Sequence, residues 1–297
     1  MRRFKTLSRS DQVFYAVITV VLTLAFICVL YPCVFVLAAS FSSGSAVQAG
    51  KVILWPVDFS LEGYKTVFNT STVFTGFRNS LFYTVAGTSI NIVVTMIAAY
   101  ALSRRDLPGR NVLMLFFIFT MFFSGGMIPS YMLIQNLGLI NTRWALLLPG
   151  AMSVYNMIVA RTFIESSIPT ELLEASKIDG CSDIRYFLSV VIPLSKSIIA
   201  VLVLFYGVGH WNQYFNAMIY LNSKHLYPLT IFLREILMAD QIDPSTVTDP
   251  VLQAQLAQAA GVIKYALIVV SMIPVLIIYP FIQKYFVKGV MIGSVKG

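Results

Sequence analysis

The charged residues that could carry chemistry gather in one stretch, EASKIDGCSDIRYFLSVVIP, which runs from residue 174 to residue 193. Its first twelve residues include five charged side chains, although long apolar segments flank the stretch on both sides: Glu174, Lys177, Asp179, Asp183 and Arg185. Carboxylates and cations at this density can form ion pairs with a polar partner. Because no nucleophile beside a base and no cluster of metal ligands accompanies them, they suggest docking more than catalysis.

The rest of the sequence lacks motifs for catalysis. The phosphate-loop pattern G-x-x-x-x-G-K-[ST] is absent, so the chain has no recognisable means of binding ATP. The two histidines, His210 and His225, lie fifteen residues apart, and no H-E-x-x-H pair occurs. We therefore expect that this chain is not an enzyme and carries no cofactor or metal of its own.

The charged stretch has the pattern of a short helix-turn-helix. The first helix is expected to begin at Pro169 or Thr170 and to end at Gly180, because glycine accepts the left-handed conformation at a helix end at little cost. Ser182 or Asp183 can cap the second helix. Such an amphipathic element could dock against a soluble partner or lie on lipid headgroups, and the pattern alone leaves both readings open.

The composition places these residues in a membrane protein. Of the 297 residues, 58% are hydrophobic and 11% are charged, and the mean hydropathy is +0.79. A soluble domain usually draws about a quarter of its sequence from charged residues. The chain therefore has too little polar surface for a soluble globule.

Long runs without charge predict an all-helical membrane protein with six spans, since about 20 helical residues cross the bilayer core. The weakest prediction is the fourth span, which has a short charge-free run and contains Pro149 and Gly150. We expect one transmembrane domain over residues 1–297, with a cytoplasmic loop at 165–193, external loops at 40–78 and 221–261, and spans at about 13–39, 79–103, 111–134, 144–164, 194–220 and 262–283.

The basic residues predict the orientation. The first apolar segment is too long for a cleavable signal sequence, so it is interpreted as a retained span. Six spans place both termini on one side, and that side then carries fourteen of the lysines and arginines against seven on the other. The positive-inside rule assigns the richer side, with both termini, to the cytoplasm. The net charge of +8 thus needs no nucleic-acid partner.

The charged stretch resembles the EAA loop of the membrane subunits of ATP-binding-cassette importers. In that pattern Glu-Ala-Ala, three residues and Gly are followed by nine residues and an apolar-x-apolar-Pro ending. Glu174, Ala175, Gly180 and Pro193 match the spacing, and Ser176 departs at the third position. Further likenesses are NSL at 79–81, WNQYF at 211–215 and the tail FVKGVMIGSVKG at 286–297.

Together these segments resemble the carbohydrate-importer branch, in particular the maltose-importer permease with a cytoplasmic tail and, more closely, permeases for pectin or alginate oligosaccharides. The resemblance implies a bacterial inner-membrane protein that forms half of a translocation path. Its implied partners are a second homologous permease, two ATPase subunits that bind ATP and Mg, and an external solute-binding protein. The substrate would be an oligosaccharide, with uronate-containing chains as the finer match.

The resemblance also implies the site residues. The EAA-type loop would form a coupling helix seated in a cleft of the ATPase, and the tail would reach the ATPase dimer interface. Glu174 would pair with or cap the ATPase surface, Ala175 would allow close approach and Gly180 would allow the turn. The implied coupling residues are Glu174, Ala175, Ser176, Asp179, Gly180 and Pro193, and those of the tail are Gly293 and Lys296.

A second group combines aromatic rings with amides near the end of the fifth span. Trp211, Asn212, Tyr214 and Asn216 suit a sugar, which offers C–H faces for stacking and hydroxyl groups for hydrogen bonds. The same residue types also form interfacial aromatic belts and fasten helices together. In the third span, the segment FFSGGMIPSYML predicts a bend or close packing.

Three other classes remain as alternatives. A self-sufficient secondary transporter or channel would normally place an ionisable group inside its spans, and the six charge-free runs supply none. A membrane enzyme would show a cluster of His, Asp or Cys residues at one membrane depth. A purely structural scaffold would not need the helix-turn-helix.

Overall fold

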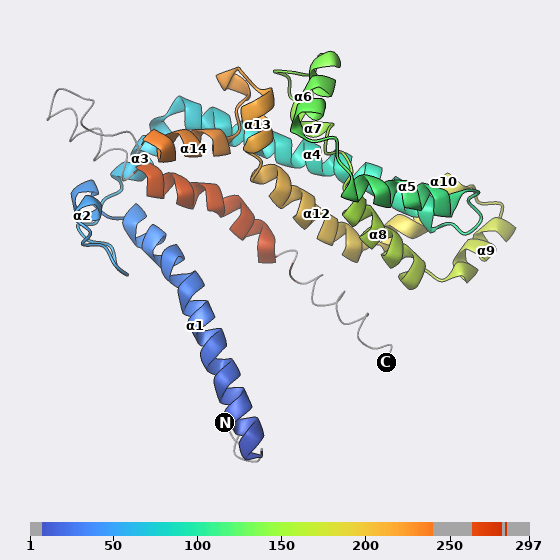
Figure 1. Cartoon of the computed structure of the whole chain (residues 1–297), viewed down its shortest axis with the longest axis horizontal. Helices are drawn as coiled ribbons and strands as arrows, with labels where there is room; N and C mark the ends of the chain where they lie inside the picture. The colour runs from blue at the N-terminus through green and yellow to red at the C-terminus, as the bar shows by residue number, and fades with distance from the viewer. Residues whose placement is uncertain (1–7, 240–262, 281–282, 284–297) are drawn as a thin grey trace. The chain divides into compact units, whose positions relative to one another are not determined.

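The computed structural model describes residues 8–239, 263–280 and 283, and these residues form helices and connecting segments (Figure 1). The chain divides into two compact units. Unit 1 comprises Met1–Thr70 and Leu233–Met272, and unit 2 comprises Ser71–Phe232 and Ile273–Gly297. Helix α14 (Leu229–Ala239) and the helix Ile263–Pro280 each contribute residues to both units.

Unit 1 is built around the long helix α1 (Arg9–Ser40), followed by α2 (Gly44–Gln48) and α3 (Glu62–Asn69). The apolar window of α1 is not buried against the described chain. A span whose backbone is fully hydrogen-bonded within its own helix can present such an apolar surface to lipid. Among the described residues, its C-terminal end packs in a small cluster that buries Ala38, Ala39, Ala46 and Val52.

Unit 2 contains the remaining helices and has α4 at its centre, packed against α12 and α8 (Figure 1). Its elements in chain order are α4 (Ser71–Ser103), α5 (Arg110–Phe122), α6 (Met127–Asn136), α7 (Trp144–Leu147), α8 (Val154–Ser167), α9 (Thr170–Ile178), α10 (Asp183–Tyr186), the π-helical turn Phe187–Val191, α11 (Ile192–Leu194), α12 (Lys196–Trp211), α13 (Phe215–Tyr220) and the 3-10 turn Lys224–Leu226.

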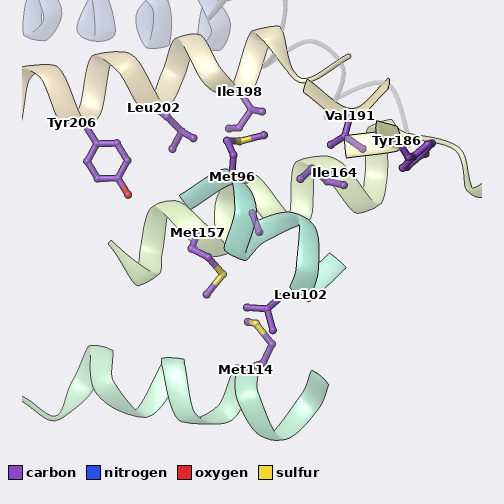
Figure 2. Close-up of a cluster of buried hydrophobic side chains, with 12 residues drawn as sticks. Met96, Leu102, Met114, Met157, Ile164, Tyr186, Val191, Ile198, Leu202 and Tyr206 are labelled. Atoms are coloured by element: carbon purple, nitrogen blue, oxygen red, sulfur yellow. The ribbon is translucent and has the colours of Figure 1, made fainter. Parts of the chain in front are cut away.

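The core of unit 2 follows from the helical periodicity of α12. Ile198, Leu202 and Tyr206 recur every four residues, so they share one face of the helix. Figure 2 shows them pointing toward Met96 of α4 and Met157 of α8. Met96, Met157 and Leu202 are almost fully buried. The flexible thioethers fill the irregular space where three helices meet.

Buried polar side chains hold α4 to the irregular segment between α7 and α8. Asn91 donates to the carbonyl of Gly150 and accepts from His210 Nε2 at 2.6 Å. The Tyr206 hydroxyl accepts from the Ser153 backbone N–H at 3.0 Å and lies 2.7 Å from the Thr95 hydroxyl. A broken helix at membrane depth exposes backbone groups that lipid cannot satisfy. Side chains of α4 and α12 therefore satisfy part of this break.

The described residues contain three uninterrupted helices long and apolar enough to cross a membrane, or five candidate spans when each of two bent helix pairs is counted as one. The predicted fourth span is divided at Pro149–Gly150 into α7 and α8. The described residues therefore leave the count of six unconfirmed. The helix of the second predicted span, α4, begins at Ser71 and not at residue 79, and the exposed Arg78 lies within it.

The third predicted span bends, as its glycines suggested. The direction of the chain changes by 112° between helices α5 and α6. Gly126 has φ +86°, and an added Cβ there would meet no atom within 4 Å. Left-handed backbone, and not close packing, is therefore what requires glycine at this position.

Replacing Leu202 by alanine should lower the free energy of unfolding by about 2–5 kcal/mol, because the lost side chain leaves a cavity among three helices. Thermal unfolding of the purified protein in detergent measures the effect. Leu115→Ala is the matched control, since Leu115 on α5 is 68% exposed and its removal leaves no internal cavity. Equal losses in the two variants would contradict the placement of Leu202 in the core.

Candidate functional site

The predicted helix-turn-helix is present as α9 and α10. Helix α9 begins directly after Pro169 and ends in a Schellman motif, in which Gly180 N–H donates to Lys177 O at 3.1 Å and Cys181 N–H donates to Ser176 O at 2.9 Å. Gly180 has φ +68°, so glycine is favoured there for its backbone conformation. The Ser182 hydroxyl then caps α10 by accepting from the backbone N–H of Arg185.

The α9–α10 hairpin, residues 170–186, is anchored on one side and exposed on the other. Tyr186 and, just beyond the hairpin, Val191 are buried in the core of unit 2. On either side of the Gly180 turn, Ile178 is 87% exposed and Ile184 is 73% exposed. Exposed apolar residues beside polar ones are typical of surfaces that meet a partner.

The predicted coupling residues lie on this hairpin or just after it. Glu174, Ala175, Asp179 and Gly180 are exposed, and so is Pro193 in α11. Within the described residues, the side chains of Glu174 and Asp179 make no ion pair or hydrogen bond. Ser176 is half-buried, and its hydroxyl donates to Leu173 O at 2.7 Å. The hairpin thus leaves Glu174 and Asp179, together with the exposed Glu171, available to a partner.

Two other charges of the hairpin are already used within the chain. Lys177 Nζ lies 3.3 Å from Asp106 Oδ2, and Asp183 Oδ1 accepts from Arg104 Nη1 at 2.8 Å. Arg104 and Asp106 belong to the loop between α4 and α5, whose arginines count among the charges that predict the orientation. The available signal was the single carboxylate in the basic loop RRDLPGR, which suggests an internal ion pair.

A second ion-pair group lies beside the first. Glu165 on α8 accepts from Arg161 at 2.9 Å and lies 3.3 Å from Arg110 on α5. Arg161 Nε also donates to Leu102 O, and Arg110 Nη1 donates to Ser103 O. These two carbonyl groups belong to the last turn of α4, whose carbonyls have no partners within the helix. Arginines from neighbouring helices therefore cap α4.

The electrostatics of the loop favour the charged forms of both partners. Hydrogen bonds from the Arg104 guanidinium hold the pKa of the Asp106 carboxyl well below its usual range, and the same bonds raise the pKa of Arg104. Burial raises the pKa of the nearby Tyr186 hydroxyl, which stays neutral. The Arg104–Asp106 pair thus remains ionised at physiological pH.

A cavity of about 260 Å³ lies between the α4–α5 loop and the α9–α10 hairpin. Its lining includes Arg104, Asp106, Glu165, Glu174 and Lys177. It contains charges of both signs, most of which are already paired. Glu174 is the lining carboxylate without such a pair among the described residues. The cavity therefore presents one available carboxylate beside the exposed hairpin surface.

The predicted sugar-contacting residues lie around the break between α12 and α13: Trp211 ends α12, and Asn216 is the second residue of α13. Asn212, Tyr214 and Asn216 are exposed, and Asn212 Nδ2 donates to Val208 O at 3.0 Å. Trp211 is only 5% exposed and meets the ring of Phe77 edge-on at 5.7 Å. The break and the first turn of α13 thus expose two amides and one aromatic ring, while Trp211 is packed against Phe77.

The NSL segment fastens a loop that follows α13. Asn79 Nδ2 donates to His225 O at 2.7 Å, and the Ser80 hydroxyl accepts from the Leu229 backbone N–H at 2.9 Å. Asn141 binds the same loop through Ser223. These contacts give the conspicuous asparagine and serine a structural role. The predicted tail residues, Gly293 and Lys296, lie outside the described residues.

Comparison with known proteins addresses the family. No protein-family model matches the sequence. A Bacillus subtilis protein named polygalacturonan/rhamnogalacturonan transport system permease protein YtcP is 43% identical over 282 residues, which cover 93% of this chain and 95% of that protein. The chain belongs to the permease subunits of ATP-binding-cassette sugar transporters. Protein LplC of Bacillus subtilis is 41% identical over 90% of this permease and 89% of its own length.

A solved structure supports the same assignment for the fold. One chain in the crystal structure of a bacterial ABC transporter involved in the import of the acidic polysaccharide alginate matches this permease with a TM-score of 0.86 and 35% sequence identity. The match covers 94% of this permease and 99% of that chain. The permease is accordingly an all-helical, multi-pass membrane protein.

Asp106→Asn should lower the thermal unfolding midpoint, and the difference from wild type should stay constant from about pH 8 to about pH 5. The pKa of Asp106 is depressed in the folded state, so its stabilisation is complete above the unfolded pKa and is lost only as the pH falls through the folded value.

Unfolding midpoints in detergent across this range, extended to more acidic pH, measure the effect. Asp179→Asn is the control, since Asp179 has no ion-pair partner among the described residues and its replacement should change the midpoint little. A wild-type advantage that disappears near neutral pH would contradict the ion pair.

Proposed function

We propose that this permease is the membrane-spanning subunit of an ATP-driven importer that moves an oligosaccharide into the bacterial cytoplasm through the inner membrane. It forms half of the translocation path and pairs with a second homologous permease. Two ATPase subunits, which bind ATP and Mg, attach on the cytoplasmic side, and a solute-binding protein delivers the sugar from outside. The full chain forms one permease domain with six spans and both termini in the cytoplasm.

The observation that carries this proposal is the exposed α9–α10 hairpin in a chain with close relatives among transport permeases. Its turn is set by Gly180, its apolar tips are Ile178 and Ile184, and Glu174 and Asp179 are available for a partner. An apolar contact rimmed by charges is how proteins commonly meet one another. An element that lay on lipid headgroups would not need these available carboxylates, because the cytoplasmic lipid surface is negatively charged.

In this proposal the hairpin seats in a cleft of the ATPase. Glu174 pairs with a basic group of the ATPase or with its backbone, and Ala175 and Ser176 let the two surfaces approach closely. Asp179 adds a contact at the turn, and Pro193 starts the path of the chain back into the membrane. The tail residues Gly293 and Lys296 add a second contact with the ATPase.

The substrate is proposed from the relatives and from the end of α12. One relative is named for polygalacturonan and rhamnogalacturonan transport, and the solved neighbour imports alginate. We therefore assign a uronate-containing oligosaccharide to this permease. Asn212, Tyr214 and Asn216 contact it, and the buried Trp211 packs against Phe77 at the same break.

A self-sufficient transporter or channel is the competing function. It would move sugar without an ATPase, and the exposed hairpin would then have no ATPase to bind. Purification of the tagged chain from its native membranes distinguishes the two. Recovery of an ATPase and a second permease supports the importer, whereas a chain that elutes alone and transports sugar in liposomes overturns it.

Gly180→Val should reduce sugar uptake about tenfold or more while the protein remains inserted, since a β-branched residue at positive φ distorts the coupling turn. The matched control is Gly138→Val. Gly138 ends α6 in the same Schellman geometry with φ +67°, and neither glycine has an atom within 4 Å of an added Cβ. Uptake by whole cells, normalised to permease in the membrane, measures both. Equal losses would mean that the backbone strain acts through stability alone.

Tyr214→Ala should reduce ATP hydrolysis stimulated by the loaded binding protein by about fivefold, and should reduce the basal rate less, because one sugar contact is lost. Trp211→Ala should change both rates by similar factors, since Trp211 is buried packing. The purified complex in liposomes provides both rates. A Tyr214 variant that changed the two rates equally would remove this residue from the sugar path.

A further inference from the structure

Arg104, in the loop between α4 and α5, is held more tightly than an exposed loop residue would be. Its side chain is only 13% exposed. Nε donates to Asp106 Oδ1 at 2.8 Å, and Nη2 donates to Asp106 Oδ2 at 2.6 Å. Two parallel bonds between a guanidinium and a carboxylate fix the relative orientation of the two groups. Neither the proposed sugar contacts nor the proposed ATPase contacts account for this arrangement of Arg104 and Asp106.

The same guanidinium reaches the hairpin. Arg104 Nη1 donates to Asp183 Oδ1 at 2.8 Å and to the Tyr100 hydroxyl at 3.0 Å. Asp183 is the first residue of α10, and Lys177 in the last turn of α9 binds Asp106 Oδ2, which also accepts from Arg104. Both helices of the hairpin are therefore connected to one pair of residues.

The Arg104 backbone is continuous with α4. Arg104 directly follows the last residue of α4, and its N–H donates to Ala101 O at 3.3 Å. The final carbonyls of α4 are held by Arg161 and Arg110 from the neighbouring helices. The C-terminal end of α4 is thus hydrogen-bonded to α5 and α8. Because Arg104 continues the backbone of α4, we expect a displacement of Arg104 to displace the end of this helix.

Aromatic contacts between the end of α4 and the hairpin lie beside the ion pairs of Arg104. The Tyr100 ring lies 5.0 Å from the ring of Phe187 and 6.4 Å from that of Tyr186. The bonds from the planar guanidinium of Arg104 are directional. The ion pairs therefore add directional contacts to the packing of Tyr186 and Leu173 against the core.

We infer that Arg104 is a positioning residue for coupling: it locks the α9–α10 hairpin to the end of α4, so that movement of the hairpin moves the transmembrane helices. The inference rests on the proposed coupling function and adds a distinct role to it. The exposed residues of the hairpin bind the ATPase, and the ion pairs of Arg104 with Asp106 and Asp183 transmit the movement. Loss of these ion pairs should leave ATP hydrolysis that is poorly linked to sugar transport.

The chemistry requires arginine. A lysine at this position carries the same charge but presents a compact ammonium group, which cannot make the paired bonds to Asp106 while reaching Asp183. Arg104→Lys should therefore retain only part of the coupling. The neighbouring Arg105 provides a matched control, because it is exposed and makes no ion pair among the described residues.

The test uses the whole importer, purified with its ATPase and second permease and reconstituted in liposomes with the loaded binding protein. The quantity measured is sugar transported per ATP hydrolysed. Arg104→Ala should lower this ratio by about fivefold or more, Arg104→Lys and Asp183→Asn should lower it less, and Arg105→Ala should leave it near wild type. A charge exchange, Arg104→Asp with Asp183→Arg, should recover part of the ratio lost in the single Arg104→Asp variant.

Each outcome has one meaning. A wild-type ratio in both Arg104→Ala and Asp183→Asn would overturn the inference. Loss of the ATPase during purification of these variants, as for a damaged docking surface, would also overturn it. Asp183→Asn keeps the test decisive if Arg104→Ala fails to fold, since the Asp183 side chain is 68% exposed. Failure of the wild-type chain to purify with any ATPase would instead refute the proposed function.

Discussion

Backbone groups inside a bilayer must find partners within the protein, and α4 supplies many of those partners in this permease. Lipid offers no hydrogen bonds, so each interruption of a helix at membrane depth needs polar side chains close by. Asn91 and Thr95 on α4, with His210 and Tyr206 on α12, serve the interruption between α7 and α8. Near its other end, Asn79 and Ser80 of α4 serve the loop after α13. The irregular segments can exist because α4 is long, continuous and polar at selected turns.

This dependence also explains why the sugar-path candidates lie at a helix break. A continuous helix has its backbone fully occupied and presents side chains at fixed angles, whereas the break at residues 212–214 exposes Asn212 and Tyr214 together. Directly before the break, Trp211 packs against Phe77. Adjacent residues of the WNQYF motif thus have different roles: Trp211 packs in the protein, and Asn212 and Tyr214 are the proposed substrate contacts.

Much of the fold was predictable because the free-energy cost of placing charge in lipid restricts where apolar helices can occur. Charge is expensive in lipid, so the charge-free runs located the apolar helices, and the helix-turn-helix was readable from Gly180 and Ser182. Local continuity was less predictable. Arg78 is charged yet lies within α4, because near a helix end its side chain can reach a polar region. Pro149 and Gly150 signalled a weak span, but whether the chain bends or breaks there depends on partners such as Asn91, which lie far away in sequence.

The ion pairs of Arg104 show where reasoning from sequence stops and why. Arg104 and Arg105 are adjacent and identical in type, and both contribute equally to the positive charge that orients the loop. Only the fold separates them: Arg104 binds Asp106 and Asp183, which lies 79 residues away, while Arg105 is exposed and makes no ion pair among the described residues. A charge count records the electrostatic cost of crossing the membrane, which every arginine shares. Pairing depends on direction, which is set only when α4, α5 and α8 have packed. One basic loop can therefore fix the topology and join the hairpin to α4, with different arginines placed for the second task.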